Sequence, residues 1–310
     1  TADSCTDVFS KTLVEIAKEK ENVVAITAAM PSGTGLAAFK KVCPERFFDV
    51  GIAEEYAVTF AAGMAASGMK PVVAVYSSFL QRAYDQILHD VCIQKLPVFF
   101  CVDRSGLVGA DGETHQGIFD LSYLSHIPNL VLMAPKNKYE MEDMMHFAMD
   151  YDGPAAMRYP RGEAFAGLKD FRPPVELGRS ESIYKGETVA ILSVGNMMEE
   201  VLKTVDLLKE QGIQPGLVNV RFIRPVDEEM LHDLAERYPL LVTAEENVLS
   251  GGFGETVSVF LHRNNYQNRL LTFGIPDCFV EHGSVEWQRK QMGIDAASMA
   301  ARIMEKVSEL

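Results

Sequence analysis

The sequence predicts an α/β fold of two consecutive domains, each a mostly parallel sheet flanked by helices. Short apolar runs of strand length alternate with longer segments of helical periodicity, which is typical of parallel sheets covered on both faces. The length of 310 residues corresponds to about two domains of ~150 residues each. The alternation lapses once, between Gly162 and Gly186, where prolines and glycines accumulate. We therefore expect domains at residues 1–162 and 188–310, joined by a linker at residues 163–187.

The composition argues against several classes of protein. An apolar content of 47% and a charged content of 23% indicate a globular protein with a substantial core. A formal net charge of -14 without a basic stripe argues against binding to nucleic acid or to an anionic membrane. No apolar run approaches the ~18 residues of a membrane span, and no signal peptide is visible. The five cysteines form no C-x-x-C pair, so we expect reduced thiols in a cytoplasmic protein.

The first domain opens with a helix and a buried strand. Asp3, Ser4 or Thr6 can cap a helix whose apolar residues recur at helical spacing up to Lys20. The buried strand at residues 23–27 follows, and then a glycine-containing loop and a helix to Lys41. The chain begins with Thr1 rather than Met, so we expect an excised piece of a longer protein.

The loop after this first strand is similar to a dinucleotide-binding fingerprint. Gly33, Gly35 and Ala38 have the spacing of its second half. The first glycine of that fingerprint belongs in the turn directly after the strand, and here residues 28–32 intervene. The sequence therefore gives little support for a nicotinamide cofactor.

A short strand at residues 47–50 turns at Gly51 into a helix that starts at Glu54 and is rich in small residues to 66. The helix dipole favours an acid in the first turn, so Glu54 can be an ordinary helix-start residue. Apolar neighbours such as Ile52, Ala57 and Val58 would also surround it. A carboxyl group in such surroundings can share or donate a proton near neutral pH.

The rest of the first domain places unusual side chains after its strands. We expect strands at residues 71–76, 97–102, 130–134 and 155–158, a helix continuing to about residue 94 and another at 138–149. The segment 105–117 is too glycine-rich and polar for a packed element. Ligands of parallel sheets bind at the carboxyl ends of the strands. Several candidates follow such ends: Glu54, Tyr76, Phe79, Arg82, Arg104, Asp111 and His115.

The second domain repeats the alternation. Strands are expected at residues 189–193, 216–220, 240–245 and 270–273, helices at 199–211 and 228–237, a further helix after the loop at 250–254, and terminal helices from Ser284 and Asp295. This half holds fewer unusual residues, so we expect it mainly to provide packing.

Each candidate residue has an ordinary structural interpretation when taken alone. His115 can be a surface histidine, and no second His or Cys stands at ligand spacing for a metal. Arg104 and Arg161 can bind a phosphate or pair with surface carboxylates. A nucleophile elbow of the type G-x-S-x-G is absent.

Three runs taken together change this assessment. They are DVGIAE at 49–54, YSSFLQRAYDQ at 76–86 and VGADGETHQG at 108–117. They resemble the transketolase superfamily of thiamine diphosphate enzymes. The runs HDV at 89–91, IQKLP at 93–97, FDLSY at 119–123 and RYPRG at 158–162 single out its 1-deoxy-D-xylulose-5-phosphate synthases. The resemblance covers essentially the whole chain, but only the pyrimidine-binding and C-terminal domains of that family.

The resemblance implies a cofactor site around Glu54. This residue matches the family glutamate that hydrogen-bonds the aminopyrimidine ring of thiamine diphosphate and promotes loss of the thiazolium proton. Phe79 matches the aromatic residue stacked on that ring, and Arg82 lies in the same cofactor-facing segment. The sequence departs from the family at Glu55 and Tyr56, where Gln-His is usual.

The resemblance also implies a substrate site. Tyr76, Arg104 and Arg161 match residues that hold the phosphate of glyceraldehyde 3-phosphate, a task suited to fixed cationic donors. Asp111 and His115 match polar residues of the substrate channel, where His115 would contact the acceptor or steer protons. Glu54 and His115 are therefore the expected catalytic residues.

The implied reaction is the condensation of pyruvate with glyceraldehyde 3-phosphate to 1-deoxy-D-xylulose 5-phosphate and carbon dioxide, which feeds isoprenoid, thiamine and pyridoxal synthesis. The Mg²⁺ and diphosphate ligands would lie on a missing N-terminal domain, so the chain alone is expected to be inactive. A homodimer is the expected assembly. A transketolase section, a 2-oxoacid dehydrogenase β subunit and an inert assembly module stay open as alternatives.

Overall fold

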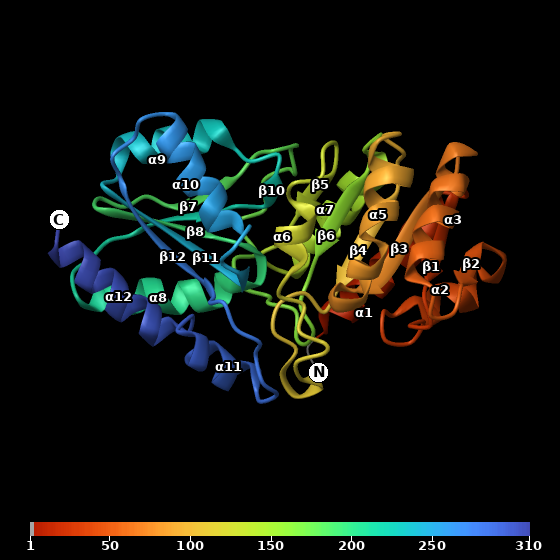
Figure 1. Ribbon diagram of the computed structural model, residues 1–310, viewed down its shortest axis with the longest axis horizontal. Helices are drawn as coiled ribbons and strands as arrows, with labels where there is room; N and C mark the ends of the chain where they lie inside the picture. The colour runs from red at the N-terminus through yellow and green to blue at the C-terminus, as the bar shows by residue number, and fades with distance from the viewer. Residues whose placement is uncertain (1–2) are drawn as a thin grey trace.

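The computed structural model describes residues 3–310 and shows two α/β units side by side (Figure 1). The predicted fold class is confirmed, because each unit has a mostly parallel sheet flanked by helices. Residues 1 and 2, which belong to the first predicted domain, lie outside the described residues. Among residues 3–310, no helix has both the length and the apolar character needed to cross a membrane.

The first sheet has seven strands in the order β10-β5-β6-β4-β3-β1-β2. All neighbouring pairs are parallel except β10 with β5, which is antiparallel. In chain order the strands are β1 (Val23–Thr27), β2 (Phe47–Asp49), β3 (Lys70–Tyr76), β4 (Phe99–Asp103), β5 (Val131–Met133), β6 (Ala155–Arg158) and β10 (Phe222–Arg224).

Helices cover both faces of the first sheet because successive strand residues point to opposite sides. In β3, Val72 packs with the cluster that includes α1 and α7, whereas Val73 packs with the cluster that includes α3. The helical elements are α1 (Cys5–Glu19), α2 (Leu36–Val42), η1 (Pro44–Arg46), α3 (Glu54–Ala66), α4 (Ser77–Leu80), η2 (Gln81–Ala83), α5 (Tyr84–Gln86), η3 (Ile87–Cys92), η4 (Gly109–Asp111), α6 (Asp120–Leu124) and α7 (Lys138–Asp150).

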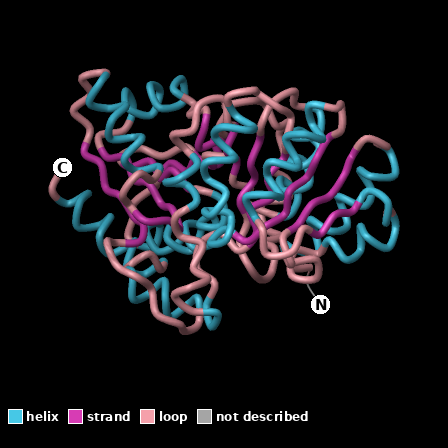
Figure 2. Tube along the Cα trace, turned by 45° about the vertical axis from the view of Figure 1, so that its right-hand side comes forward, coloured by secondary structure: helices cyan, strands magenta, loops and turns pink. Residues whose placement is uncertain are grey.

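The second sheet has five strands in the order β12-β11-β8-β9-β7, and only β7 runs antiparallel to its neighbour. Figure 2 shows the strands of both sheets in magenta, with cyan helices around them. The elements are β7 (Glu181–Tyr184), β8 (Val189–Ser193), η5 (Gly195–Met197), α8 (Met198–Glu210), β9 (Gly216–Asn219), α9 (Glu228–Arg237), β11 (Leu240–Val248), α10 (Phe253–Arg263), β12 (Arg269–Ile275), α11 (Val285–Met292) and α12 (Ala296–Ser308).

Side-chain caps fix several of the predicted helix starts. Ser4 caps α1 in a reciprocal capping box with Asp7. Ser284 accepts a hydrogen bond from the amide of Trp287, and Asp295 accepts one from the amide of Ser298. The starts predicted at Ser4, Ser284 and Asp295 are therefore confirmed.

Short elements were missed by the sequence pattern. No strand is predicted between Gly162 and Gly186, yet β7 forms the edge of the second sheet there. β10 leaves the second half of the chain and pairs Phe222 with Met133 of the first sheet. The helix predicted up to about residue 94 is divided into α4, η2, α5 and η3, and α6 was not predicted. These elements are too short to show a period, so tertiary pairing decides them.

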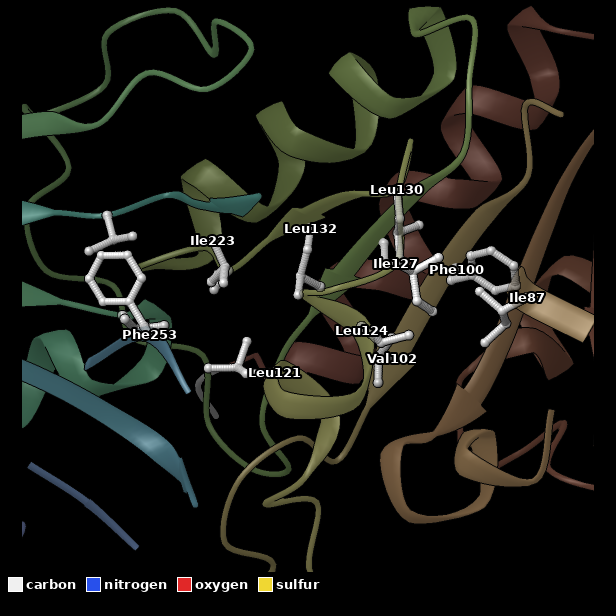
Figure 3. Packing of buried hydrophobic residues seen from close by; sticks show 14 of the residues in the cluster. Ile87, Phe100, Val102, Leu121, Leu124, Ile127, Leu130, Leu132, Ile223 and Phe253 are labelled. Carbon is white, nitrogen blue, oxygen red and sulfur yellow. The ribbon is translucent and has the colours of Figure 1, made fainter. Parts of the chain in front are cut away.

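One hydrophobic cluster joins the two units. Figure 3 shows Leu121 and Leu132 of the first half between Phe100 on one side and Ile223 and Phe253 of the second half on the other. A buried charged cluster reinforces the junction. Its members are Lys136, Glu140, Glu181, Asn219 and Arg221. The two units therefore share a core and a buried ionic network, which fixes how they sit together.

Candidate active site

The sequence-predicted residues gather at the carboxyl ends of neighbouring strands. Tyr76 is the last residue of β3 and lies opposite Asp103, the last residue of β4. β6 neighbours β4 and ends at Arg158, which precedes the segment that carries Arg161. This register brings Tyr76, Arg104 and Arg161 to one edge of the first sheet, as expected for parallel strands.

Glu54 is the first residue of α3 and its side chain is only 2% exposed. The sequence indicated apolar surroundings. Ala57 and Val58 are buried in this helix, as expected, but Ile52 is 81% exposed, so the expectation was wrong for that residue. The structure adds a cation, because Arg82 Nη1 donates to Glu54 Oε1 at 2.7 Å. Among the described residues no hydrogen bond reaches Glu54 Oε2. One carboxylate oxygen is thus fixed, and the other can meet a ligand.

A row of aromatic rings continues from this ion pair. The Arg82 guanidinium lies 4.9 Å from the centroid of the Phe79 ring, a cation–π distance. Phe79 meets His115 edge to face at 5.3 Å and stacks with Tyr76 at 5.9 Å between ring centroids. Burial is the largest cause that raises the pKa of the Tyr76 hydroxyl. A Cβ at Gly33 would lie 1.6 Å from Tyr76 Oη, so the glycine there makes room for the phenol.

Two arginines converge at the other end of the row. Arg104 places its guanidinium 3.9 Å from the Tyr76 ring centroid and donates to Asp111 Oδ2 at 2.9 Å. Arg161 Nη1 lies 3.0 Å from the same oxygen, and its side chain is 46% exposed. Arg104 adopts a left-handed φ of 57°, which costs backbone energy for a residue with a Cβ. The arrangement is an anion-binding point in which two guanidinium groups hold one carboxylate.

All the predicted site residues therefore belong to one series of contacts. It runs from Glu54 through Arg82, Phe79, Tyr76 and Arg104 to Asp111 and Arg161, and His115 joins it at Phe79. The His115 ring is half-buried, and its Nδ1 is 2.9 Å from Thr114 Oγ1. The series separates a carboxylate end at Glu54 from a cationic end at Arg104 and Arg161.

Asp103 is a buried carboxyl group that the sequence analysis missed. Its Oδ1 accepts from the amide of Arg104 at 2.6 Å, and its Oδ2 is 3.4 Å from Thr6 Oγ1. Burial is the largest cause that raises the Asp103 pKa to about 7. The residue therefore supports the strained backbone that aims Arg104. An acid at the end of an apolar strand was the available sequence signal.

A second missed group braces the segment that carries Phe79. Asp120 is fully buried, and its Oδ1 accepts from Arg158 Nε at 2.6 Å. Its Oδ2 accepts from the hydroxyl of Ser77 at 2.6 Å. Tyr123 adds a hydrogen bond to the Ser77 carbonyl at 3.0 Å. These contacts fix α4 at the end of β3, and thereby the direction of Phe79.

The second unit, expected mainly to provide packing, also contacts the segment 105–117 of the site. Glu246 of β11 is fully buried, and its Oε1 accepts from the amide of Leu107 at 2.9 Å. Asn196 donates to the same oxygen at 2.9 Å. The buried polar run 245–247 after an apolar strand was the sequence signal for this contact.

The described residues contain no group of three or more His, Cys, Asp or Glu side chains placed to hold a metal ion. All five cysteines are free thiols, as the sequence indicated, and only Cys278 is exposed. The side chains gathered at the site include the Glu54 carboxylate, aromatic rings, a histidine and paired arginines.

Comparisons with known proteins match both units. A family described as transketolase, pyrimidine binding domain, matches residues 3–165, and one described as transketolase, C-terminal domain, matches residues 178–299. The 1-deoxy-D-xylulose-5-phosphate synthase of Lachnoclostridium phytofermentans is 56% identical over 301 residues, which cover 97% of this chain and 48% of that protein. The synthase of Caldanaerobacter subterraneus subsp. tengcongensis is 49% identical over 308 residues, covering 99% and 50%. The chain thus spans about half the length of the curated relatives it matches.

Solved structures share the fold. A split-gene transketolase, solved as an inactive β4 tetramer, is 27% identical with a TM-score of 0.87, and the match covers 99% of each chain. Transketolase from Campylobacter jejuni is 18% identical with a TM-score of 0.80, covering 98% of this chain and 47% of that one. The second likeness concerns the fold alone.

Proposed function

We propose that this chain, which belongs to the transketolase family, supplies the pyrimidine-facing half of a thiamine diphosphate-dependent 1-deoxy-D-xylulose-5-phosphate synthase. The reaction condenses pyruvate with D-glyceraldehyde 3-phosphate and releases carbon dioxide, the first step of the methylerythritol phosphate route to isoprenoids. Its support is the identity of 56% and 49% to proteins of that name. The enzyme class is a transferase of aldehyde or ketone groups.

The buried Glu54 carboxylate is the observation that carries the proposal. The cofactor's aminopyrimidine ring needs a carboxyl partner that can share a proton with a ring nitrogen, beside an aromatic surface. Glu54 Oε1 is held by Arg82 at 2.7 Å, Oε2 has no partner among the described residues, and Phe79 lies next to Arg82. The residues present therefore fit the group, and Glu54, Phe79 and Arg82 would hold it.

When bound, thiamine diphosphate supplies a thiazolium carbon that adds to the keto group of pyruvate. The chain's own residues prepare this chemistry. Glu54 holds or gives a proton at Oε2, and Arg82 keeps its carboxylate oriented through Oε1. Phe79 presents its ring beside the Arg82 guanidinium. His115, in edge contact with Phe79, is proposed to move a proton at the acceptor aldehyde.

The paired arginines are proposed to bind the phosphate of glyceraldehyde 3-phosphate. Arg104 and Arg161 already hold one anionic oxygen of Asp111 at 2.9 and 3.0 Å. A phosphate offers the same charge sign and more acceptor oxygens. Tyr76, stacked under Arg104, is proposed to add its hydroxyl to this phosphate site. Asp111 lines the channel and keeps the two guanidinium groups together.

The Mg²⁺ ion and the diphosphate are proposed to be bound by a separate N-terminal domain, either in the same enzyme or as a second chain. The assembly is proposed to be a homodimer in the cytoplasm. The split-gene transketolase, which matches this chain over 99% of its length and was solved as an inactive β4 tetramer, supports the idea that such a half folds alone without activity. The 310-residue chain alone is accordingly expected to produce no deoxyxylulose phosphate.

Substitution of Glu54 in the catalytically complete assembly tests the proposal. Glu54→Ala should lower turnover of pyruvate with glyceraldehyde 3-phosphate by about three powers of ten or more. The matched control is Glu55→Gln, whose side chain is the exposed neighbour in the same helix turn, and it should keep turnover within about threefold. Unchanged turnover in Glu54→Ala would remove the mechanism. Product formation from a ketose phosphate donor, or transfer to lipoamide, would indicate one of the alternative enzymes instead.

A further inference from the structure

We infer that helix α11 of the second unit positions the acceptor-phosphate end of the site, with Gln288 as the principal positioning residue. The inference rests on the proposed function only for the identity of the substrate. The structure itself supplies the contacts that join α11 to the segment 105–117, the site loop. In Figure 1 this loop is the yellow segment at the bottom centre, and α11 lies beside it in blue.

The side chain of Gln288 forms two hydrogen bonds with the backbone of Gly109 in the site loop. Its side chain is completely buried. Oε1 accepts from the amide of Gly109 at 3.2 Å, while Nε2 donates to the Gly109 carbonyl at 3.2 Å and to the Glu281 carbonyl at 2.7 Å. Both groups of the carboxamide are thus used, as is usual for a buried polar side chain, and two of the three hydrogen bonds connect α11 to the backbone of Gly109.

Gly109 has a backbone conformation and surroundings that favour glycine at the position bound by Gln288. Its φ is 70°, a left-handed value, and a Cβ there would lie 3.2 Å from the Gly283 carbonyl oxygen. The two hydrogen bonds with Gln288 also fix the first residue of η4, the short turn that ends at Asp111. Arg161 donates to the Val108 carbonyl at 3.2 Å. Because Gln288 holds this turn, it also fixes the position at which the Asp111 carboxylate contacts Arg104 and Arg161.

The next residue of α11 anchors the other end of the turn indirectly. Arg289 Nε donates to Glu246 Oε2 at 2.7 Å, and Glu246 Oε1 accepts from the Leu107 amide at 2.9 Å. A Cβ at Gly106 would lie 2.4 Å from Glu246 Oε1, so the loop passes directly against this carboxylate. Gln288 and Arg289 therefore hold residues 107 and 109 together.

The positions of these contacts predict that loss of the Gln288 hydrogen bonds affects the acceptor-phosphate end of the site and not the Glu54 end. The loop carries Asp111 and, at its far end, His115, whereas Glu54 and Arg82 lie on elements that α11 does not contact through these bonds. Loosening Gly109 should displace the acceptor-phosphate end first. A general loss of structure would instead affect both substrates and the stability of the whole chain.

The test compares Gln288→Met with Gln291→Met, a matched control on the same helix whose side chain is exposed. In the complete assembly, Gln288→Met should raise the KM for glyceraldehyde 3-phosphate about tenfold or more, and leave kcat and the KM for pyruvate within about threefold. In the 310-residue chain alone, hydrogen exchange at the amides of Leu107 and Gly109 should become faster. Gln291→Met should change neither measurement.

The KM measurement and the hydrogen-exchange measurement test the positioning role of Gln288 independently of the proposed function. An unchanged acceptor KM and unchanged hydrogen exchange in Gln288→Met would refute the positioning role of Gln288 and leave the proposed function standing. If the wild-type assembly makes no deoxyxylulose phosphate, the proposed function fails, and the exchange measurement still decides whether α11 holds the loop. Arg289→Met supplies the same test through Glu246 if Gln288→Met does not fold.

Discussion

The buried carboxyl group of Asp103 should make the stability of the chain depend on pH. Asp103 lies at the end of β4 with no solvent exposure, and burial is the main cause that raises its pKa from 3.8 to about 7. In Asp103→Asn the side chain keeps an oxygen for the amide hydrogen bond of Arg104, which measures 2.6 Å in the wild type. The substitution therefore removes the titration and conserves the shape.

The sign and size of the effect follow from proton linkage. The folded chain binds the proton more tightly than the unfolded chain, so the stabilisation is complete below pH 3.8 and is lost as the pH rises through about 7. A pKa difference of about three corresponds to about 4 kcal/mol, at 1.36 kcal/mol for each pKa unit. Relative to Asp103→Asn, the wild type should lose about 4 kcal/mol between pH 4 and pH 8.

Urea unfolding followed by circular dichroism, at half-unit steps of pH, measures this difference. Glu245 is also buried, and its pKa is raised to about 7 mainly by burial, but it contributes equally to both proteins and cancels in the comparison. Asp206→Asn, on the exposed side of α8, serves as the control and should run parallel to the wild type. A stability difference between wild type and Asp103→Asn that stays constant from pH 4 to pH 8 would refute the reasoning.

Two further changes test the junction of the units and the packing of the site. Glu140→Ala removes the carboxylate that accepts from Arg221 at 2.6 Å and leaves this buried guanidinium without a carboxylate partner, whereas Lys136 keeps its ion pair with Glu181. Urea unfolding should therefore show a loss of about 3–5 kcal/mol. Glu142→Ala, at a surface ion pair, should cost about 1 kcal/mol or less. Gly33→Ala places a Cβ 1.6 Å from the Tyr76 hydroxyl oxygen and 2.8 Å from the ring carbon Cζ. In the proposed reaction it should raise the KM for glyceraldehyde 3-phosphate about tenfold. An equal effect in a Tyr76→Ala background, which removes the whole ring, would contradict this cause.

The sequence predicted much of the site because local order along the chain determines which residues follow strand ends. Tyr76 and Arg104 follow apolar runs that could only be strands in an alternating pattern, and parallel strands bring their carboxyl ends together. The ion pair between Glu54 and Arg82 could not be predicted in this way. It depends on how η2 packs against α3, which is a tertiary contact between segments 28 residues apart.

The contribution of the second unit could not be read from periodicity either. Gln288 lies in a short helix whose exposed residues dominate its sequence, and its buried position depends on a loop 179 residues away. β10 has only three residues, and it becomes a strand because the edge of β5 offers it unpaired backbone groups. Interactions of this range are decided by the packing of the two units and leave no local pattern.

The two ends of the site therefore depend on different parts of the molecule. Glu54, Arg82 and Phe79 lie on α3, η2 and α4, all of which pack within the first unit. The proposed acceptor-phosphate end depends on a loop whose amides at 107 and 109 are held by Glu246 and Gln288 of the second unit. Changes at the junction of the units should thus displace the Arg104 and Arg161 end of the site before they affect the Glu54 carboxylate.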